Sequence, residues 1–146
     1  MRVVVQRVTA ARVLVAGESI AAIGRGLLLL VGLAPGDGER SVEWMARKVA
    51  GLRIFADAAG QMNAALADVG GAVLAVPNFT LLGDCRKGRR PSFDAALAPG
   101  AAEPLFARLV EMLTTHVAAP VAAGRFGATM QVELVNDGPV TFIIET

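Results

Sequence analysis

The sequence contains very few of the residues that most catalytic and metal centres use. It has one cysteine, Cys85, and one histidine, His116, among 146 residues. A single cysteine forms no internal disulfide, which suits a reducing compartment. These two residues cannot supply a zinc cluster, so neither a metal nor a cofactor is expected. His116 falls near the end of an expected helix, where an imidazolium interacts favourably with the helix dipole, so we expect it to be structural.

Long apolar runs, a leader sequence and a strong net charge are also missing. The apolar run at residues 27–31 is far shorter than the roughly 20 residues that span a bilayer. Residues 1–7 carry charge and lack the apolar core and cleavage site of a signal peptide. We therefore expect a cytoplasmic protein without a membrane partner. The net charge of +1 also argues against a DNA-binding protein.

What is present indicates a globular chain with a substantial core, since 54% of the residues are apolar and 18% charged. The patterns predict strands over residues 2–9, 12–16, 19–23, 27–33, 53–56 and 72–76, and again after residue 120. Helical spacing predicts helices over residues 39–52 and 103–116, with Asp37 as the N-cap of the first and Pro104 in the first turn of the second. Without internal repeats, residues 1–146 are expected to form one compact α/β domain.

The most informative motif is Gly138-Pro139, which lies between two β-prone stretches, residues 130–135 and 140–144. A hairpin between them would normally use Asn-Gly or Asp-Gly alone to supply positive φ. The added proline removes a backbone donor and fixes φ. The pattern predicts a rigid turn that presents carbonyls, which suits recognition of an amino group. A proline that only ends a strand is the alternative.

A long loop at residues 83–102 is rich in glycine, proline and charge, and such loops are often functional. Its cations are concentrated in five residues, as Arg86, Lys87, Arg89 and Arg90. They could contact phosphates without a basic balance over the whole chain. A loop that is merely solvated is the alternative.

No Ser-His-Asp or Cys-His pair is available for covalent acyl transfer. Thr80 is the natural candidate for a nucleophile, but no recognisable base accompanies it. The alternative role for its hydroxyl is to bond a neighbouring backbone group at the end of a strand.

Several short motifs, in order and spacing over nearly the whole chain, together resemble the D-aminoacyl-tRNA deacylase family. Three segments carry most of the likeness: residues 77–82, residues 124–130, and the turn at residues 136–142. The other motifs are Gln6-Arg7-Val8, Arg53-Ile54-Phe55, Met62-Asn63 and Arg90-Pro91-Ser92-Phe93.

The resemblance implies an ester hydrolase that removes D-amino acids from mischarged tRNA, with glycine as a further substrate. It also implies a mixed, partly barrel-like sheet with two main helices. A homodimer is implied too, in which a cis Gly138-Pro139 turn reaches into the partner's pocket. The turn's carbonyls would meet the substrate's α-amino group, and an L side chain would collide with the turn.

The resemblance also distributes roles among the residues. The preferred mechanism positions the ester and a water, assisted by the substrate's ribose hydroxyl, with backbone N–H groups of Phe79 and Thr80 stabilising the oxyanion. The expected catalytic residues are Asn78, Phe79 and Thr80. The expected substrate-binding residues are Pro77, Leu81, Gly138, Pro139, Phe126 and Met130, of which Phe126 and Met130 could equally be core or pocket-wall residues. The basic residues Arg86, Lys87, Arg89 and Arg90 would bind tRNA.

The chain departs from the family pattern at Pro77-Asn78, where most members have Ser-Gln. Asn78 is one methylene shorter than glutamine, so its contacts must be aimed differently. A sibling subgroup from animals, more tolerant of L-amino acids, also carries proline there. Two alternatives follow: a sibling-type deacylase acting on L-Ala mischarged on tRNA, or a non-catalytic module that binds the tRNA end. A purely structural dimer is a third reading, which explains neither the basic loop nor the Gly-Pro turn.

Overall fold

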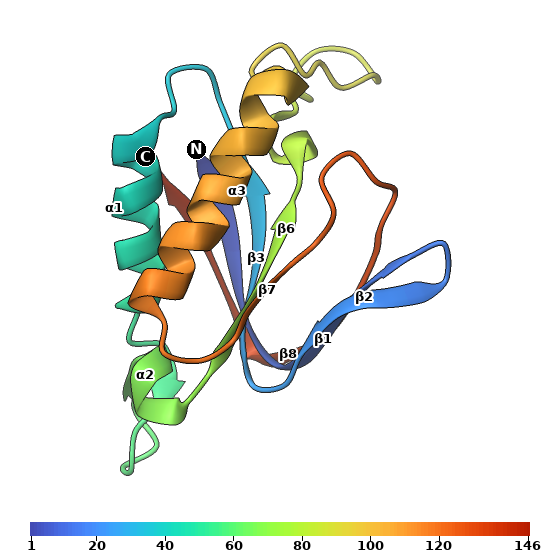
Figure 1. Cartoon of the computed structure of the whole chain (residues 1–146). Coiled ribbons are helices and arrows are strands. Elements are labelled where there is room, and N and C mark those ends of the chain that lie inside the picture. Colours follow the sequence, from blue (N-terminus) through green and yellow to red (C-terminus); the bar gives the residue numbers. More distant parts are fainter.

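The computed structural model describes residues 1–146, and a curled six-stranded sheet lies at its centre (Figure 1). Its strands are β1 (Arg2–Val15), β2 (Glu18–Ile23), β3 (Gly26–Gly32), β6 (Ala72–Pro77), β7 (Val121–Ala123) and β8 (Gln131–Glu145). A second sheet pairs β4 (Phe55–Ala56) with β5 (Met62–Ala64). The helices are α1 (Glu39–Ala50), α2 (Leu66–Val69) and α3 (Pro99–His116), with a 3₁₀ helix η1 (Phe79–Leu82). The predicted mixed α/β class with two long helices is confirmed.

Strand β1 organises the sheet. Its first half pairs antiparallel with β3, its second half pairs with β2, and β8 pairs along its other side. Strand β3 continues in parallel to β6, and β6 to β7, so these two connections cross over through α1 and α3. The carboxyl ends of β3 and β6 therefore lie side by side, while β8 forms a free edge.

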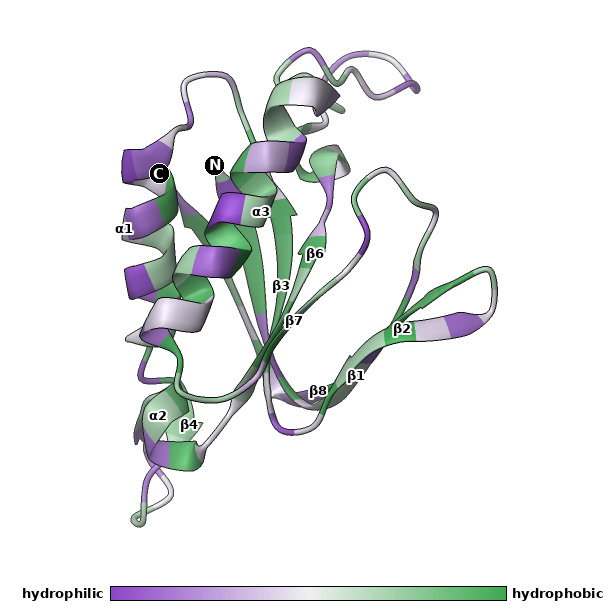
Figure 2. Cartoon of the chain, in the orientation of Figure 1, coloured by the Kyte–Doolittle hydropathy of each residue, from purple (hydrophilic) through white to green (hydrophobic).

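The two long helices cover one face of the sheet (Figure 1). Helix α1 buries a stripe at Val42, Met45, Ala46 and Val49, as its spacing predicts, and its charged residues face outward (Figure 2). Helix α3 buries Phe106, Leu109 and Leu113. The buried residues of both helices belong to one hydrophobic core of 23 residues. No helix is long and apolar enough to cross a bilayer.

A smaller core of seven buried residues, including Val8, Val13 and Leu74, is separate from the first. Strand β1 is long enough to bend, and its second half with β2 folds away from the helices (Figure 1). The sheet thus encloses apolar side chains within its own curl, which accounts for the partly barrel-like shape.

Two expectations about the helix starts are wrong. Helix α3 begins at Pro99, so Pro104 lies inside the helix and not in its first turn. Proline at the first position has a suitable φ and no needed N–H, and the buried Ala102 anchors the extra turn. The N-cap of α1 is Gly38 and not Asp37. The Asp37 carboxylate instead accepts hydrogen bonds from the Ala34 N–H and the Met1 ammonium, at 2.7 and 2.6 Å.

The expected hairpin at Gly138-Pro139 is also wrong. Residues 131–145 form the single strand β8, which runs antiparallel to β1 on both sides of the Gly-Pro pair. Residues 137–140 are not paired with β1 and form an excursion within this one strand. Pairing with β1 over the strand's whole length is possible because β1 itself has 14 residues.

Candidate functional site

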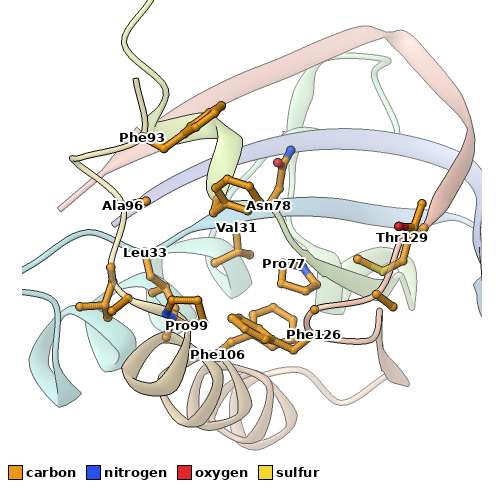
Figure 3. Close-up of a pocket in the computed structure, with 17 residues that line it drawn as sticks. Val31, Leu33, Pro77, Asn78, Phe93, Ala96, Pro99, Phe106, Phe126 and Thr129 are labelled. Carbon is orange, nitrogen blue, oxygen red and sulfur yellow. The ribbon is translucent and has the colours of Figure 1, made fainter. Parts of the chain in front are cut away.

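A largely apolar pocket of about 590 Å³ opens where β6 ends (Figure 3). Its floor includes Phe106 of α3 and Phe126 of the loop before β8, whose ring centroids lie 6.4 Å apart. Its walls come from β3, β6, residues 93–99 and residues 126–130. A site beyond the carboxyl ends of parallel strands is the position where open α/β sheets commonly bind ligands.

The pocket brings together five of the residues assigned to substrate handling from the sequence. They are Pro77, Asn78, Phe79, Phe126 and Met130. Thr80 and Leu81 follow directly in η1 but do not line the pocket. The sequence segments 77–82 and 124–130 therefore meet in space, although about 45 residues separate them in the sequence.

Strand β6 fixes the position of Asn78. Pro77 pairs with Val31, and the Asn78 N–H donates to the Val31 carbonyl over 2.7 Å. The chain then turns into η1, whose first N–H groups have no partner within a helix. The Thr80 hydroxyl donates to Asn78 Oδ1 over 2.5 Å, so the two side chains form a pair at the pocket edge.

Several residues that line the pocket had no role predicted from the sequence. Phe106 was predicted only as part of the helix at residues 103–116, yet it forms part of the floor. Phe93 belongs to the motif Arg90-Pro91-Ser92-Phe93, in which it had no predicted role. Its ring contacts that of Phe79 edge-on, with 5.2 Å between the ring centroids. The aromatic character of the Ser92-Phe93 motif is the one signal that could have suggested a pocket rim.

None of the 17 lining residues carries an ionisable side chain. No group of three His, Cys, Asp or Glu residues lies anywhere in position to hold a metal ion. The pocket can offer backbone N–H groups, the Asn78 amide and the Thr129 hydroxyl as polar contacts. Its own side chains therefore provide no acid or base for ester hydrolysis.

The Gly-Pro turn is held in shape by polar contacts with β1. Residues 137–140 stand opposite Arg7 alone, because Gln6 pairs with Thr141 and Val8 with Asn136. Asn136 Oδ1 accepts the Val140 N–H at 2.9 Å, and its Nδ2 donates to Gln6 Oε1 at 2.6 Å. The excursion is thus closed at its base by one amide side chain.

Arg7 supports the same turn from below. Its Nε donates to the Asp137 carbonyl at 3.1 Å and lies 3.0 Å from the Asp137 carboxylate, while Nη1 donates to the Ile54 carbonyl at 2.6 Å. The Gly138-Pro139 peptide bond is cis, and both residues are exposed. Held by the contacts of Asn136 and Arg7, the exposed turn forms a backbone corner on the edge strand β8.

This corner does not reach the pocket of its own chain. Pro77 of β6 pairs with Val31 of β3, which in turn pairs with Val3 of β1. The turn in β8 instead lies opposite Arg7, further along β1. The offset is about 13 Å along the strands and about 14 Å across them. Neither Gly138 nor Pro139 lines the pocket.

The basic loop lies outside the pocket as well. Arg86 forms an ion pair with Asp84 at 2.7 Å, and its hydrogen bonds hold the pKa of that carboxyl below the usual value. Lys87, Arg89 and Arg90 are exposed and take part in no ion pair. Three uncompensated cations thus lie on the segment that joins η1 to the pocket wall at Phe93.

Comparison with known proteins identifies close relatives over the whole chain. The sequence profile of a family described as D-Tyr-tRNA(Tyr) deacylase matches residues 4–145. A Geobacter metallireducens protein named D-aminoacyl-tRNA deacylase is 53% identical over 146 residues, which cover 100% of this chain and 96% of the relative. A Halalkalibacterium halodurans protein of the same name is 51% identical over 149 residues, covering 100% and 99%.

Two solved structures have the same fold. One, described as c-Myc DNA Unwinding Element Binding Protein, superposes with a TM-score of 0.93 at 40% identity and covers 100% of this chain and 99% of that one. The other, described as a probable eukaryotic D-amino acid tRNA deacylase, has a TM-score of 0.84 at 19% identity, covering 98% and 97%. At that identity the second likeness concerns the fold alone.

Proposed function

The chain belongs to the D-Tyr-tRNA(Tyr) deacylase family and is a D-aminoacyl-tRNA deacylase, and on that premise we propose that it proofreads the chirality of aminoacyl esters. It rejects L-aminoacyl-tRNA and also clears glycine mischarged on tRNA. Residues 1–146 act as one deacylase domain, and the enzyme works in the cytoplasm, where charged tRNAs are found. The observation that carries this proposal is the pocket of Asn78 and Phe79, which has no ionisable lining.

Such a pocket suits hydrolysis by a positioned water. The water oxygen adds to the ester carbonyl carbon and loses its proton, the bond to the ribose oxygen breaks, and that oxygen gains a proton. The neighbouring ribose hydroxyl relays the proton, so no protein base is required. Backbone N–H groups of Phe79 and Thr80 stabilise the oxyanion. Thr80 is not the nucleophile, which agrees with its hydroxyl being bonded to Asn78 and outside the pocket lining.

Handedness is sensed by the Gly-Pro turn of a second subunit in a homodimer. The turn is exposed and far from its own pocket. It lies on the free edge strand β8, which also exposes the apolar side chains Val135, Phe142 and Ile143. The turn's carbonyls accept hydrogen bonds from the substrate's α-amino group, and the corner excludes an L side chain.

Turnover of matched esters tests this proposal. D-Tyr-tRNA and Gly-tRNA should be hydrolysed at least about a hundredfold faster than L-Tyr-tRNA, since the excluded side chain would displace the ester from the water. L-Ala-tRNA is the discriminating substrate because Pro77 is shared with the sibling subgroup. Fast cleavage of L-Ala-tRNA would contradict strict rejection of L esters, and binding without any cleavage would identify a non-catalytic module.

The basic loop binds the phosphates of the tRNA acceptor end. Lys87, Arg89 and Arg90 are free of carboxylate partners and lie on the loop that runs from η1 to Phe93. Phosphate contacts of this kind carry no sequence information, which allows one enzyme to serve many tRNAs.

Removing two of these charges should flatten the salt dependence of tRNA binding. For Arg89→Ala with Arg90→Ala, we expect the slope of log affinity against log salt to fall in magnitude by about two. Filter binding over a series of salt concentrations measures it. The control, Arg40→Ala with Lys48→Ala, removes two charges from α1 and should leave the slope nearly unchanged. Equal slopes for the loop variant and the wild type would contradict the assignment.

A further inference from the structure

Arg125 is an unpaired cation beside the pocket. Its side chain is exposed and forms no ion pair with any carboxylate of the chain. The next residue, Phe126, lies on the pocket floor. Among all the residues that directly precede or follow a lining residue in the sequence, Arg125 is the single cation. Its guanidinium is therefore available to an anion at the mouth of the pocket.

Hydrogen bonds of the backbone hold Arg125 in place. The Gly124 N–H donates to the Ala75 carbonyl of β6 over 2.8 Å, which ties the loop to the strand that ends at the pocket. The Ala128 N–H donates to the Arg125 carbonyl over 3.3 Å and closes a turn. Phe126 lies within this turn and points into the pocket (Figure 3). The Cα of Arg125 is thus held at a defined position relative to the pocket floor.

The pocket suits the base and the sugar of a nucleotide but not its phosphate. Four phenylalanine rings line it, those of Phe79, Phe93, Phe106 and Phe126. Aromatic rings of this kind stack on nucleic-acid bases. The lining has no ionisable side chain, so nothing in it neutralises a phosphodiester. A nucleoside bound among these rings must leave its 5′ phosphate at the mouth of the pocket, where a cation is needed.

The basic loop is set apart from the pocket by a closed base. The Asp84 N–H donates to the Ser92 carbonyl over 2.7 Å, and the Ser92 N–H donates to the Asp84 carbonyl over 3.0 Å. Residues 85–91, with all the cations of the loop, lie beyond these two bonds. The loop continues into the pocket wall at Phe93, whereas Arg125 precedes a different wall. The two groups of cations are thus placed for different phosphates.

We propose that Arg125 binds the phosphodiester on the 5′ side of the terminal nucleotide of aminoacyl-tRNA, and that the basic loop binds phosphates further along the acceptor end. The proposal rests on the proposed function and divides its tRNA contacts between two sites. A guanidinium can donate two parallel N–H bonds to one phosphate. Because this phosphate is remote from the ester, the contact is equally strong in the bound substrate and in the transition state. It therefore lowers KM and leaves kcat unchanged.

Two minimal esters test the proposal. One is the D-tyrosyl ester of adenosine, the nucleoside that ends every tRNA. The other is the D-tyrosyl ester of adenosine 5′-methylphosphate, which adds the single charge of a phosphodiester. Wild-type kcat/KM should be about tenfold higher for the charged ester, as expected for one charge-assisted contact. Arg125→Ala should remove this advantage through KM alone, and Arg125→Lys, which keeps the charge without the paired donors, should retain part of it.

The uncharged ester and whole tRNA provide two further measurements on Arg125→Ala. The variant should hydrolyse the uncharged ester at the wild-type rate, since an exposed side chain is removed and the pocket is intact. On D-Tyr-tRNA it should raise KM about tenfold at constant kcat. The slope of log affinity against log salt should fall in magnitude by about one.

Two control variants separate Arg125 from the other cations. Arg40→Ala removes an exposed, unpaired charge from α1 and should leave the kinetics of both esters unchanged. Arg89→Ala with Arg90→Ala should keep the tenfold advantage of the charged ester, because those residues contact phosphates that the minimal ester lacks. The same variant should still weaken the binding of whole tRNA.

Four results would overturn the proposal. The first three are equal wild-type kcat/KM for the two esters, an undiminished advantage in Arg125→Ala, and loss of the advantage in the basic-loop variant. The fourth is a lower kcat of Arg125→Ala on the uncharged ester, since Arg125 would then act by shaping the pocket floor. Failure of the proposed function is distinct, because the wild-type protein would then release D-tyrosine neither from the esters nor from tRNA.

Discussion

Replacing Gly138 with alanine is expected to abolish deacylation while leaving the fold intact. Gly138 has φ +133°, which L side chains rarely adopt. An added Cβ would also lie 2.7 Å from Val140 Cγ2 and 2.9 Å from the Val140 nitrogen. The corner must therefore move, and a displacement of about 1 Å at the reacting groups can lower a rate a hundredfold. Single-turnover cleavage of D-Tyr-tRNA measures the loss.

The effect on stability should be much smaller. The turn is exposed on the edge strand, so its strain costs on the order of 1–3 kcal/mol of the free energy of unfolding. Gly60→Ala is the matched control, because Gly60 has φ +77° with nothing within 4 Å of the added Cβ and lies in another turn. It should lose comparable stability and keep full activity. Near-normal activity in Gly138→Ala would contradict the proposed role of the turn.

Local patterns were sufficient to predict the two long helices and most strands, but not the short helices α2 and η1. The buried stripe of α1 follows directly from its apolar spacing, and its charged residues face solvent in the structure. His116 lies in the last turn of α3, as expected. Such features depend on residues three or four positions apart, and this spacing can be read directly from the sequence.

The path of the chain around Gly138-Pro139 could not be read in the same way. Asn-Asp-Gly between two β-prone stretches is typical of a hairpin, and it predicts two strands. The structure has one strand because both stretches pair with β1, about 130 residues earlier in the chain. The contacts that shape the excursion, from Arg7 and Gln6, are equally distant in sequence.

The pocket could be predicted only in part, because some of its residues are placed by local sequence and others by long-range packing. Asn78 and Phe79 follow a recognisable buried strand, and their position at its carboxyl end is a local property. The floor depends on how α3 packs across the sheet, which brings Phe106 against Phe126. Neither aromatic residue differs in sequence from an ordinary core residue, so only the packing assigns them to a cavity.

Mixed dimers provide the strongest test of a shared active site. Gly138→Ala has a defective turn and an intact pocket, whereas Asn78→Ala has an intact turn and a defective pocket. Each homodimer should be nearly inactive. In a mixed dimer, the pocket of the first variant receives the turn of the second, so one of the two sites is complete. Dimers purified through two different affinity tags should therefore recover about half of the wild-type rate.

Recovery of activity in the mixed dimer is not expected from any mechanism in which each subunit works alone. If each turn served the pocket of its own chain, both sites of the mixed dimer would carry one defect and activity would stay low. The geometry within one chain favours exchange, because Gly138 and Pro139 are exposed and lie outside the lining of their own pocket. A dimer of two Gly138→Ala chains with different tags is the control for tagging and should remain inactive. Absence of recovery in the mixed dimer would mean that handedness is sensed within one subunit.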